Sequence, residues 1–266
     1  MSQLTLKLKA APSGRIDLSG LAPALAAGAT ISAISQLTVA HGVRLSDIFT
    51  VSGTTGGSVI IAGGSERLDG VGAGLTGGSL VVEGDVGANA GVGMKGGKLE
   101  IRGSAGPYLA SGMKGGIIHV TGNVGDHIGG VAAGHRFGMT GGNVIIDGNI
   151  GARAGDKMRR GLILVRGKTG DAAGSRMIGG TIVAESGFGT NAGQLMRRGT
   201  LIGPKVERMS STFADCGLHE LVILSVMSRA WTRELGPLAP KPIPRTVRRF
   251  AGDLAAIGKG EVLITA

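Results

Sequence analysis

One short phrase returns seven times within residues 75–203. Its copies begin at Leu75, Met94, Met113, Met139, Met158, Met177 and Met196. Neighbouring copies are 19 residues apart in five cases and 26 residues apart in one. A fixed period this short, with methionine at the start of six copies, indicates stacked copies of one small unit rather than a conventional globular domain. Any function of the chain has to be compatible with such an array.

Within each copy, apolar and polar residues alternate. In the copy that begins at Met94, the apolar residues Leu99 and Ile101 alternate with Glu100 and Arg102, which predicts a strand with one buried face. Glycines follow the strand in fixed columns, so there is no room for a helix, and glycine readily forms the left-handed turns that wrap a chain into a coil. We therefore predict an all-β fold, a single-stranded parallel β-helix with about 19 residues per coil.

The same pattern predicts which positions point inward in every coil. The first inward column is Leu80, Leu99, Ile118, Val144, Ile163 and Ile182, and the second is Val82, Ile101, Val120, Ile146 and Val165. With 52 glycines and only 3% aromatic residues, the chain has to build its core from Val, Ile, Leu and Met. Each methionine should stack on the next at the spacing of neighbouring strands, about 4.8 Å.

The remaining composition excludes several classes of protein. The only cysteine is Cys216, so the chain has no internal disulfide and no CxxC metal motif. Residues 1–12 lack a charged start followed by an apolar run, and no run of 18 apolar residues occurs. We therefore expect no signal peptide, a cytoplasmic location and no membrane contact. One Trp, one Tyr and five Phe provide no stacking platform for bases, so nucleic acid is not the expected partner.

Breaks in the repeat divide the chain into three predicted segments. Residues 1–53 should form an N-terminal cap of strands with a helix near residues 21–27, covering the open strand edge of the coil. Residues 54–203 should form the glycine-rich β-helix. Residues 204–266 should form a C-terminal helix, predicted over 213–235 by its apolar spacing, a stiff proline-containing linker over 237–244, and an extended tail.

Positive charge accumulates in one column of the repeat. The chain has a net charge of +10, and residues 75–203 contain 14 basic and 8 acidic residues, a net of +6. A ladder of cations is predicted along one edge from Lys95, Lys114, Arg159, Arg160, Arg197 and Arg198. A row of like charges is self-repulsive, so a polyanionic partner would explain it. The alternative is an ordinary solvated surface.

Residue spacing predicts no catalytic or metal site. The five histidines form no HExxH pair and no Ser/His/Asp arrangement, and His119 is interpreted as a surface residue. Asp126 and Asp171 share a column but lie two coils apart, which is a weak basis for a glycosidase-type pair. His135 and Arg136 lie in the one enlarged coil, where residues 130–138 should protrude as a loop.

Several segments resemble a known family. Residues 84–91 and 148–155 share the spacing GxxGxxxG, which is similar to the β-helical domain at the C-terminus of glutamate synthase. The whole chain resembles the C-type subunit of the formylmethanofuran dehydrogenase family. Residues 39–51 (VAHGVRLSDIFTV) resemble the lead-in of that protein, and residues 249–264 (RFAGDLAAIGKGEVLI) resemble its tail. The resemblance implies that the β-helix is right-handed.

The resemblance implies a non-catalytic scaffold in a larger enzyme. In methylotrophic bacteria the related complex is a formyltransferase/hydrolase, which moves a formyl group from tetrahydromethanopterin to methylofuran and then releases formate. In methanogens it is a tungsten or molybdenum dehydrogenase that reduces carbon dioxide onto methanofuran. An Ala-, Gly- and Arg-rich chain with a pI near 10.4 favours the bacterial complex. A purely structural module and a stand-alone β-helix enzyme stay open as alternatives.

The resemblance also implies specific partners and contacts. The chain should bind no cofactor or metal itself, should assemble with subunits of the A, B and D types, and should meet methylofuran only as the carrier of the complex. Furan carriers of this kind have glutamate-rich tails, which are suitable partners for the cation ladder. Contacts with other subunits are expected at Arg249 and Phe250 of the tail, and at His135 and Arg136 because protruding loops often make contacts. For the loop, a plain structural role is the alternative.

Overall fold

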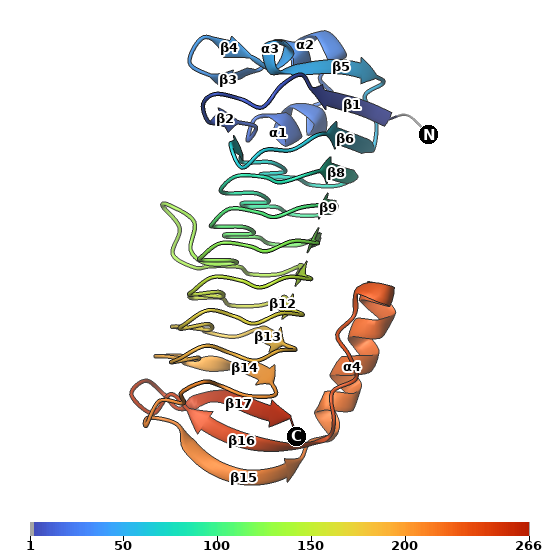
Figure 1. Ribbon diagram of the computed structural model, residues 1–266. Coiled ribbons are helices and arrows are strands. Elements are labelled where there is room, and N and C mark those ends of the chain that lie inside the picture. The colour runs from blue at the N-terminus through green and yellow to red at the C-terminus, as the bar shows by residue number, and fades with distance from the viewer. Residues whose placement is uncertain (1–2, 266) are drawn as a thin grey trace.

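The computed structural model describes residues 3–265, and strands dominate it. In that part of the chain, thirteen strands form one mostly parallel sheet, so the predicted all-β class is confirmed. From one end to the other the sheet order is β15-β16-β17-β14-β13-β12-β11-β10-β9-β8-β6-β1-β5. Through its middle the strands follow one another in chain order, and Figure 1 shows them as rungs stacked along a long molecule.

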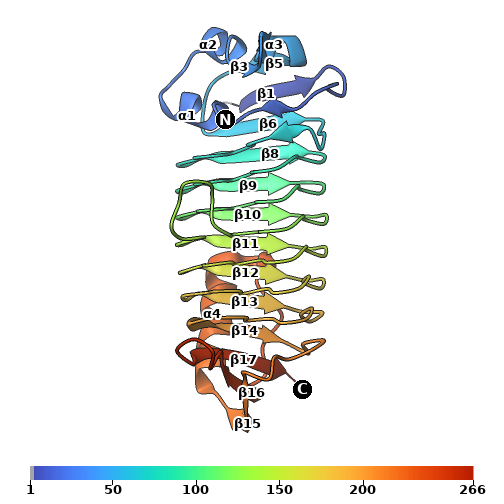
Figure 2. The ribbon, with the colours of Figure 1, turned by 90° about the vertical axis from the view of Figure 1, so that its left-hand side faces the viewer.

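The middle strands correspond to the sequence repeats. They are β6 Ser58–Ala62, β8 Ser79–Glu83, β9 Lys98–Ile101, β10 Ile117–Val120, β11 Asn143–Ile146, β12 Leu162–Val165, β13 Thr181–Ala184 and β14 Arg198–Gly203. Each strand pairs in parallel with the next, and equivalent residues face each other: Leu99 lies between Leu80 and Ile118. Figure 2 shows the strands pointing the same way. The columns of the sequence are therefore rows in space.

A second line of parallel contacts runs beside the sheet. Isolated parallel bridges join Val86 to Ala105, Ala105 to Val124, Val124 to Ile150, and Ile150 to Thr169. These residues belong to the short apolar step after each strand. Successive repeats are thus held to one another at two separate places along each turn of the chain.

One buried apolar cluster contains the predicted columns together with Val86, Ala105, Val124 and Ile150 of the second line. Leu99, Ile101, Ile118 and Val120 are fully buried, which confirms their inward orientation. The six methionines that begin the repeats are also fully buried: Met94, Met113, Met139, Met158, Met177 and Met196. An unbranched thioether can fill the narrow interior without strain.

The methionine column explains one of the glycine columns. A side chain at Gly116 would meet the Cε atom of Met94 at 2.7 Å, and one at Gly180 would meet that of Met158 at 2.8 Å. Each methionine therefore extends over a glycine of the following repeat. Both glycines also have positive φ, so the position excludes a side chain on steric and on backbone grounds.

The N-terminal end of the sheet is closed by a small group of elements. Strand β1 Gln3–Leu8 pairs in parallel with β6 and antiparallel with β5 Phe49–Gly53. The other elements are β2 Ile16–Asp17, α1 Leu21–Ala26, α2 Ile31–Ser35, β3 Thr38–Ala40, β4 Val43–Arg44, α3 Leu45–Ile48 and, further along the chain, β7 Leu68–Asp69. Helix α1 confirms the helix predicted near residues 21–27.

The helix predicted over residues 213–235 is wrong in its first part. Residues Ala214–Glu220 form strand β15, and helix α4 spans only Val222–Leu235. The apolar spacing does not indicate the strand. Strand β15 forms by antiparallel pairing with β16 Thr246–Gly252, a partner far along the chain. Strand β17 Lys259–Thr265 then joins β16 to β14, so the tail belongs to the main sheet.

Helix α4 and the short helix η1 Gly236–Leu238 cover part of the outer face of the sheet. Beneath these helices, the outward-facing residues of the strands change from polar to apolar. The outward column carries Glu100 and His119 on β9 and β10, and it becomes apolar in the following strands. The covered apolar residues are Ile145, Leu164, Val183 and Ile202, which pack with Leu224 and Leu235 of α4. The helix therefore sits where the sheet would otherwise expose an apolar surface.

Burial of the inward columns can be tested at Ile101. An unpaired carboxylate in this position costs several kcal/mol, so Ile101→Asp should unfold the repeat region at temperatures where the parent is folded. Circular dichroism melts measure the change. Thr121→Asp, at an exposed position of the next repeat, is the control and should melt near the parent. An Ile101→Asp protein that melts within a degree or two of the parent would contradict an inward orientation.

Candidate functional site

The basic ladder begins at the bend that precedes each strand. All six of its side chains are exposed or partly exposed. The bend is held by the previous repeat: the backbone N–H of Lys114 donates to the carbonyl of Met94 at 2.8 Å, and that of Arg159 donates to the carbonyl of Met139 at 2.8 Å. Because each buried methionine is followed directly by the ladder position, anchoring the methionine also fixes the place of the cation.

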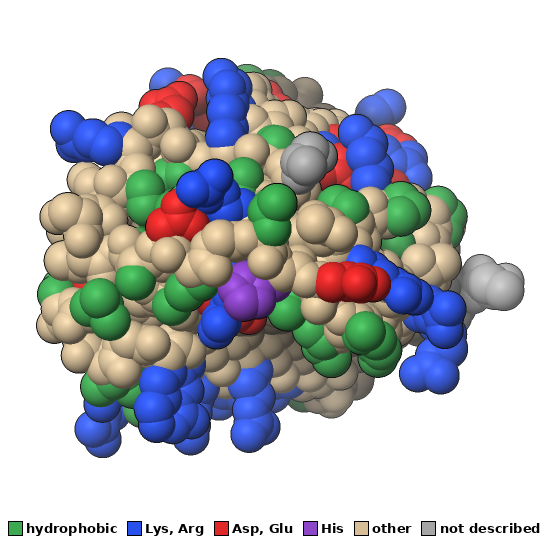
Figure 3. Space-filling model, turned by 90° about the horizontal axis from the view of Figure 1, so that it is seen from below, with side chains coloured by type: hydrophobic (Ala, Val, Ile, Leu, Met, Phe, Trp, Pro, Cys, Tyr) green, Lys and Arg blue, Asp and Glu red, His purple; other side chains and the backbone are tan. Residues whose placement is uncertain are grey.

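Four cations of the ladder line one groove. Arg159, Arg160, Arg197 and Arg198 surround a space of about 390 Å³ together with Ile178 and Ile257. Lys95 and Lys114 lie further along the same row and do not line this groove. In the view of Figure 3, Lys and Arg side chains line the lower edge, and others lie along the upper and right-hand edges. Within residues 3–265, none of the six ladder side chains forms an ion pair with a carboxylate.

The inserted loop contributes a contact that the residue spacing does not predict. The guanidinium of Arg159 lies 5.2 Å from the ring centre of Phe137, and that of Arg136 lies 5.5 Å from the same ring. A cation within about 6 Å of an aromatic ring is attracted to its face. Phe137 therefore brings the loop against the ladder and places Arg136 beside it. In the sequence, the feature that could have indicated this contact is the pair Arg136 and Phe137, a basic and an aromatic residue side by side in the one enlarged repeat.

The other three predicted contact residues lie in different surroundings. His135 is exposed and its Nδ1 contacts the carbonyl of Ala133 within its own loop at 3.0 Å. Arg249 is on β16, where its Nε donates to Glu261 Oε2 at 3.0 Å. Phe250, also on β16, packs against the core. The structure brings only Arg136 of these four to the ladder.

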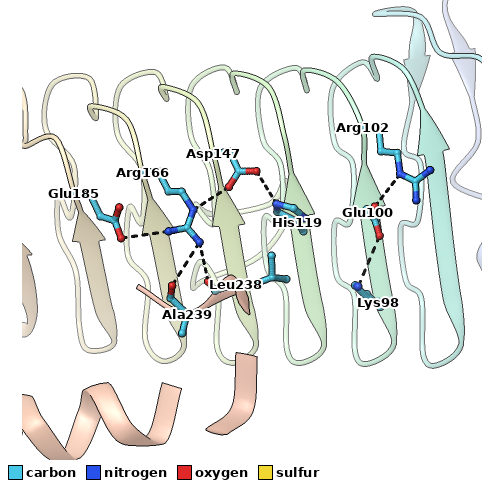
Figure 4. Close-up of polar contacts among 9 residues, drawn as sticks. All are labelled: Lys98, Glu100, Arg102, His119, Asp147, Arg166, Glu185, Leu238 and Ala239. Carbon is cyan, nitrogen blue, oxygen red and sulfur yellow. Dashed lines mark hydrogen bonds and ion pairs between the residues drawn. The ribbon is translucent and has the colours of Figure 1, made fainter. Parts of the chain in front are cut away.

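A chain of polar contacts runs along the outer face of the sheet (Figure 4). His119 Nε2 lies 2.9 Å from Asp147 Oδ2, and Arg166 Nε donates to Asp147 Oδ1 at 3.1 Å. Arg166 Nη1 also donates to Glu185 Oε1 at 3.4 Å. His119 is therefore a partly exposed residue of the outward column that is paired with Asp147. The sequence feature that could have indicated these contacts is the alternation of charge at one repeat position, with Asp147, Arg166 and Glu185 in successive repeats.

The same chain of contacts fastens the C-terminal segment to the sheet. Arg166 Nη2 donates to the carbonyls of Leu238 and Ala239 at 3.4 and 3.5 Å, and the backbone N–H of Lys241 donates to Glu185 Oε1 at 2.9 Å. The carboxylate of Glu185 is largely buried. These groups satisfy one another, which indicates a structural role for this polar cluster.

The acids of the turn columns are also occupied by structural contacts. Asp126 Oδ1 accepts the backbone N–H of Ala152 at 2.7 Å, and Asp171 Oδ1 accepts that of Thr190 at 2.8 Å. The hydrogen bond from Thr190 lowers the pKa of Asp171. A general acid would need a raised pKa, so this environment does not suit Asp171 to proton donation. Each of these carboxylates joins one repeat to the next.

Two further groups of contacts bear on possible chemistry. The ring of Tyr108 stacks on that of His127 at 5.0 Å, one repeat apart, which forms a small aromatic pair. Among residues 3–265, no three His, Cys, Asp or Glu side chains gather in a way that could hold a metal ion. In the same range, no helix has both the length and the hydropathy needed to span a bilayer.

Comparison with known proteins places the chain beside one bacterial complex. No family model matches the chain. It is 40% identical over 86 residues to the C-type subunit of the formyltransferase/hydrolase complex Fhc of Methylorubrum extorquens, a match that spans 31% of this chain and 32% of the relative.

A solved structure extends the likeness to the full length. It is the crystal structure of the formyltransferase/hydrolase complex (FhcABCD) from Methylorubrum extorquens in complex with methylofuran. The matching chain is 40% identical, with a TM-score of 0.90, and the match covers 98% of this chain and 99% of that one. The chain therefore belongs to the family of C-type subunits of the formyltransferase/hydrolase complex.

Proposed function

We propose that this chain is a non-catalytic scaffold subunit of a cytoplasmic formyltransferase/hydrolase complex. The complex would transfer a formyl group from tetrahydromethanopterin to methylofuran and hydrolyse it to formate, with this chain bound to subunits of the A, B and D types. The observation that carries the proposal is the likeness at 40% identity over 98% of the chain to a component of such a complex. The structural use of Asp126 and Asp171 supports a scaffold role, since it leaves these carboxylates engaged with backbone groups.

The architecture we propose is a right-handed parallel β-helix over residues 54–203, with an N-terminal cap over 1–53 and a C-terminal helix and tail over 204–266. Two observations support it. Each strand from β9 to β14 pairs in parallel with its predecessor in the sequence, and a second line of parallel bridges accompanies the sheet. Such a rod is suited to holding other subunits at fixed separations.

The basic ladder is the part of the scaffold that we propose contacts the carrier. A polyglutamate tail would lie along Lys95, Lys114, Arg159, Arg160, Arg197 and Arg198 while the furan end visits the other subunits. Two observations support this role: none of the six cations forms an ion pair with a carboxylate in the described chain, and four of them line one groove. Exposed ion pairs contribute only about 0.2 to 1 kcal/mol each, so the tail would be held by repetition and would stay mobile.

Our first functional prediction concerns the isolated chain. It should neither transfer formyl groups nor hydrolyse formylmethylofuran, and it should contain no stoichiometric metal, because the proposed chemistry belongs to its partners. A formate-release assay and metal analysis of the purified chain measure both points. Turnover by the pure chain at a rate comparable with the whole complex would overturn the scaffold role.

The second prediction concerns the ladder in the assembled complex. Reversing Arg159, Arg160, Arg197 and Arg198 to Glu should raise the apparent KM for the natural carrier by about tenfold or more, given the contribution of each pair. The difference between parent and variant should shrink as salt rises, because screening acts over about 8 Å at physiological ionic strength. A carrier without its tail should show no difference.

A reversal of two lysines elsewhere, with half the charge change of the ladder variant, controls for an effect of net charge alone. Lys7 and Lys9 lie on and beside β1, far from the ladder along the sheet, and their reversal to Glu should leave the KM unchanged. If the ladder variant assembles normally and treats both carriers as the parent does, the six cations are only a solvated surface.

A further inference from the structure

Helix α4 is apolar on two opposite faces. Its inner face packs on the sheet through Leu224 and Leu235, which are almost fully buried. On its outer side Val222, Ile223 and Val226 are 61%, 55% and 55% exposed. A helix at the surface of a protein normally turns polar residues toward water. The outer side of α4 therefore has an apolar surface that the packing of this chain does not use.

The outer side has a definite pattern of apolar and charged residues. Val222, Val226, Arg229 and Arg233 follow one another at intervals of four, three and four residues, so they lie in one line along the helix. We call these four residues the α4 outer stripe. Both arginines are exposed, and neither forms an ion pair with another residue in the part of the chain that the structure describes. The stripe is thus apolar in its first half and cationic in its second.

An open strand edge adjoins the start of this helix. Strand β15 is the last strand of the sheet, and among residues 3–265 it pairs only with β16. Leu218 near its end is 71% exposed, which is the largest exposure of a big apolar residue in the described chain. Figure 1 shows β15 at one end of the molecule, with α4 rising from it beside the sheet. Open edges with apolar side chains are common sites of protein association.

The charges indicate what kind of surface would cover the stripe. A second copy of this chain would bring another net charge of +10 to the contact and would leave the arginines without partners. A different protein with an apolar centre flanked by carboxylates would bury Val222 and Val226 and would also neutralise Arg229 and Arg233. Arginine beside an apolar centre is typical of the strongly contributing residues of protein interfaces.

We propose that the α4 outer stripe and the adjoining edge of β15 dock another, different subunit through an apolar surface flanked by acidic residues. This inference rests on the proposed membership of a hetero-oligomeric complex and names the surface that joins this chain to it. The contact lies on the opposite side of α4 from the residues that hold the helix to the sheet. The helix can therefore bind a partner without leaving its place.

The test is assembly of the complex from co-expressed subunits. With a tag on another subunit, the yield of this chain in the purified complex is measured for the parent and for a Val222→Glu, Val226→Glu variant. Both positions are exposed and Glu favours helix at least as well as Val, so the isolated variant should keep the circular dichroism spectrum and melting temperature of the parent. The recovered chain should fall by about tenfold or more, as expected for loss of central interface residues.

Two further variants sharpen the result. Arg229→Glu with Arg233→Glu should also reduce recovery, because the reversed charges would face the acidic rim. Leu254→Glu is the matched control: Leu254 is 61% exposed and lies outside α4 and β15, and its substitution should leave recovery unchanged.

The possible outcomes separate this inference from the proposed function. If the parent chain does not co-purify with the tagged subunit, the proposed function and the inference both fall. If the parent co-purifies and the Val222→Glu, Val226→Glu variant does so equally well, the function stands and the docking surface is wrong. If the isolated parent is a dimer that this variant dissociates, a second copy is the occupant and the inference is again wrong.

Discussion

The constant register between neighbouring repeats is the constraint on which the whole structure depends. Each repeat uses the backbone groups of the one before it, as when the N–H of Lys95 donates to the carbonyl of Leu75 and that of Lys114 to the carbonyl of Met94. A slip of one residue would turn every inward side chain outward. This register has three consequences. Each methionine extends over a glycine of the following repeat, the turn carboxylates accept backbone N–H groups of the following repeat, and the cations of the ladder lie in a row. A single rule repeated along the chain thus sets both the core and the surface.

Features that depend on this local repeat are predictable from the sequence. The inward columns that contain Leu99 and Ile101 are buried as expected. They are predictable because the alternation of apolar and polar residues recurs in the repeats at a nearly constant period. The strand β15 is not predictable, since its apolar spacing fits a helix and its partner β16 lies far along the chain. Pairing between segments that are distant in sequence can override the local preference for helix, and such pairing cannot be predicted from a local sequence pattern.

The candidate site shows the same division. The row of six cations follows from the period alone, whereas the contact of Arg159 with Phe137 depends on how the inserted loop folds back. The spacing predicts that His119 is a surface residue, but it does not predict the pairing with Asp147, because the two residues are 28 positions apart in the chain. The spacing of Asp126 and Asp171 gives only weak support for a catalytic pair. Their hydrogen bonds from backbone N–H groups of the following repeat explain why Asp occurs at this repeat position. For Asp171, the lowered pKa means that its stabilising contact is present above the ordinary carboxyl pKa and is lost as the pH falls through the lowered value.

The covering of the outer sheet face by α4 has a consequence for how the molecule opens. In the described chain each strand from β9 to β13 pairs with the strands directly before and after it in sequence, so neighbouring strands can separate without the rest of the sheet. Arg166 and Glu185 tie β12 and β13 to the returning chain at Leu238 and Lys241, and the apolar cluster spreads this attachment from β11 to β14. These four strands must therefore open together. Strands β8 and β9 lie beyond this brace in the described chain, and amide exchange through partial opening should be fastest on their side of the rod.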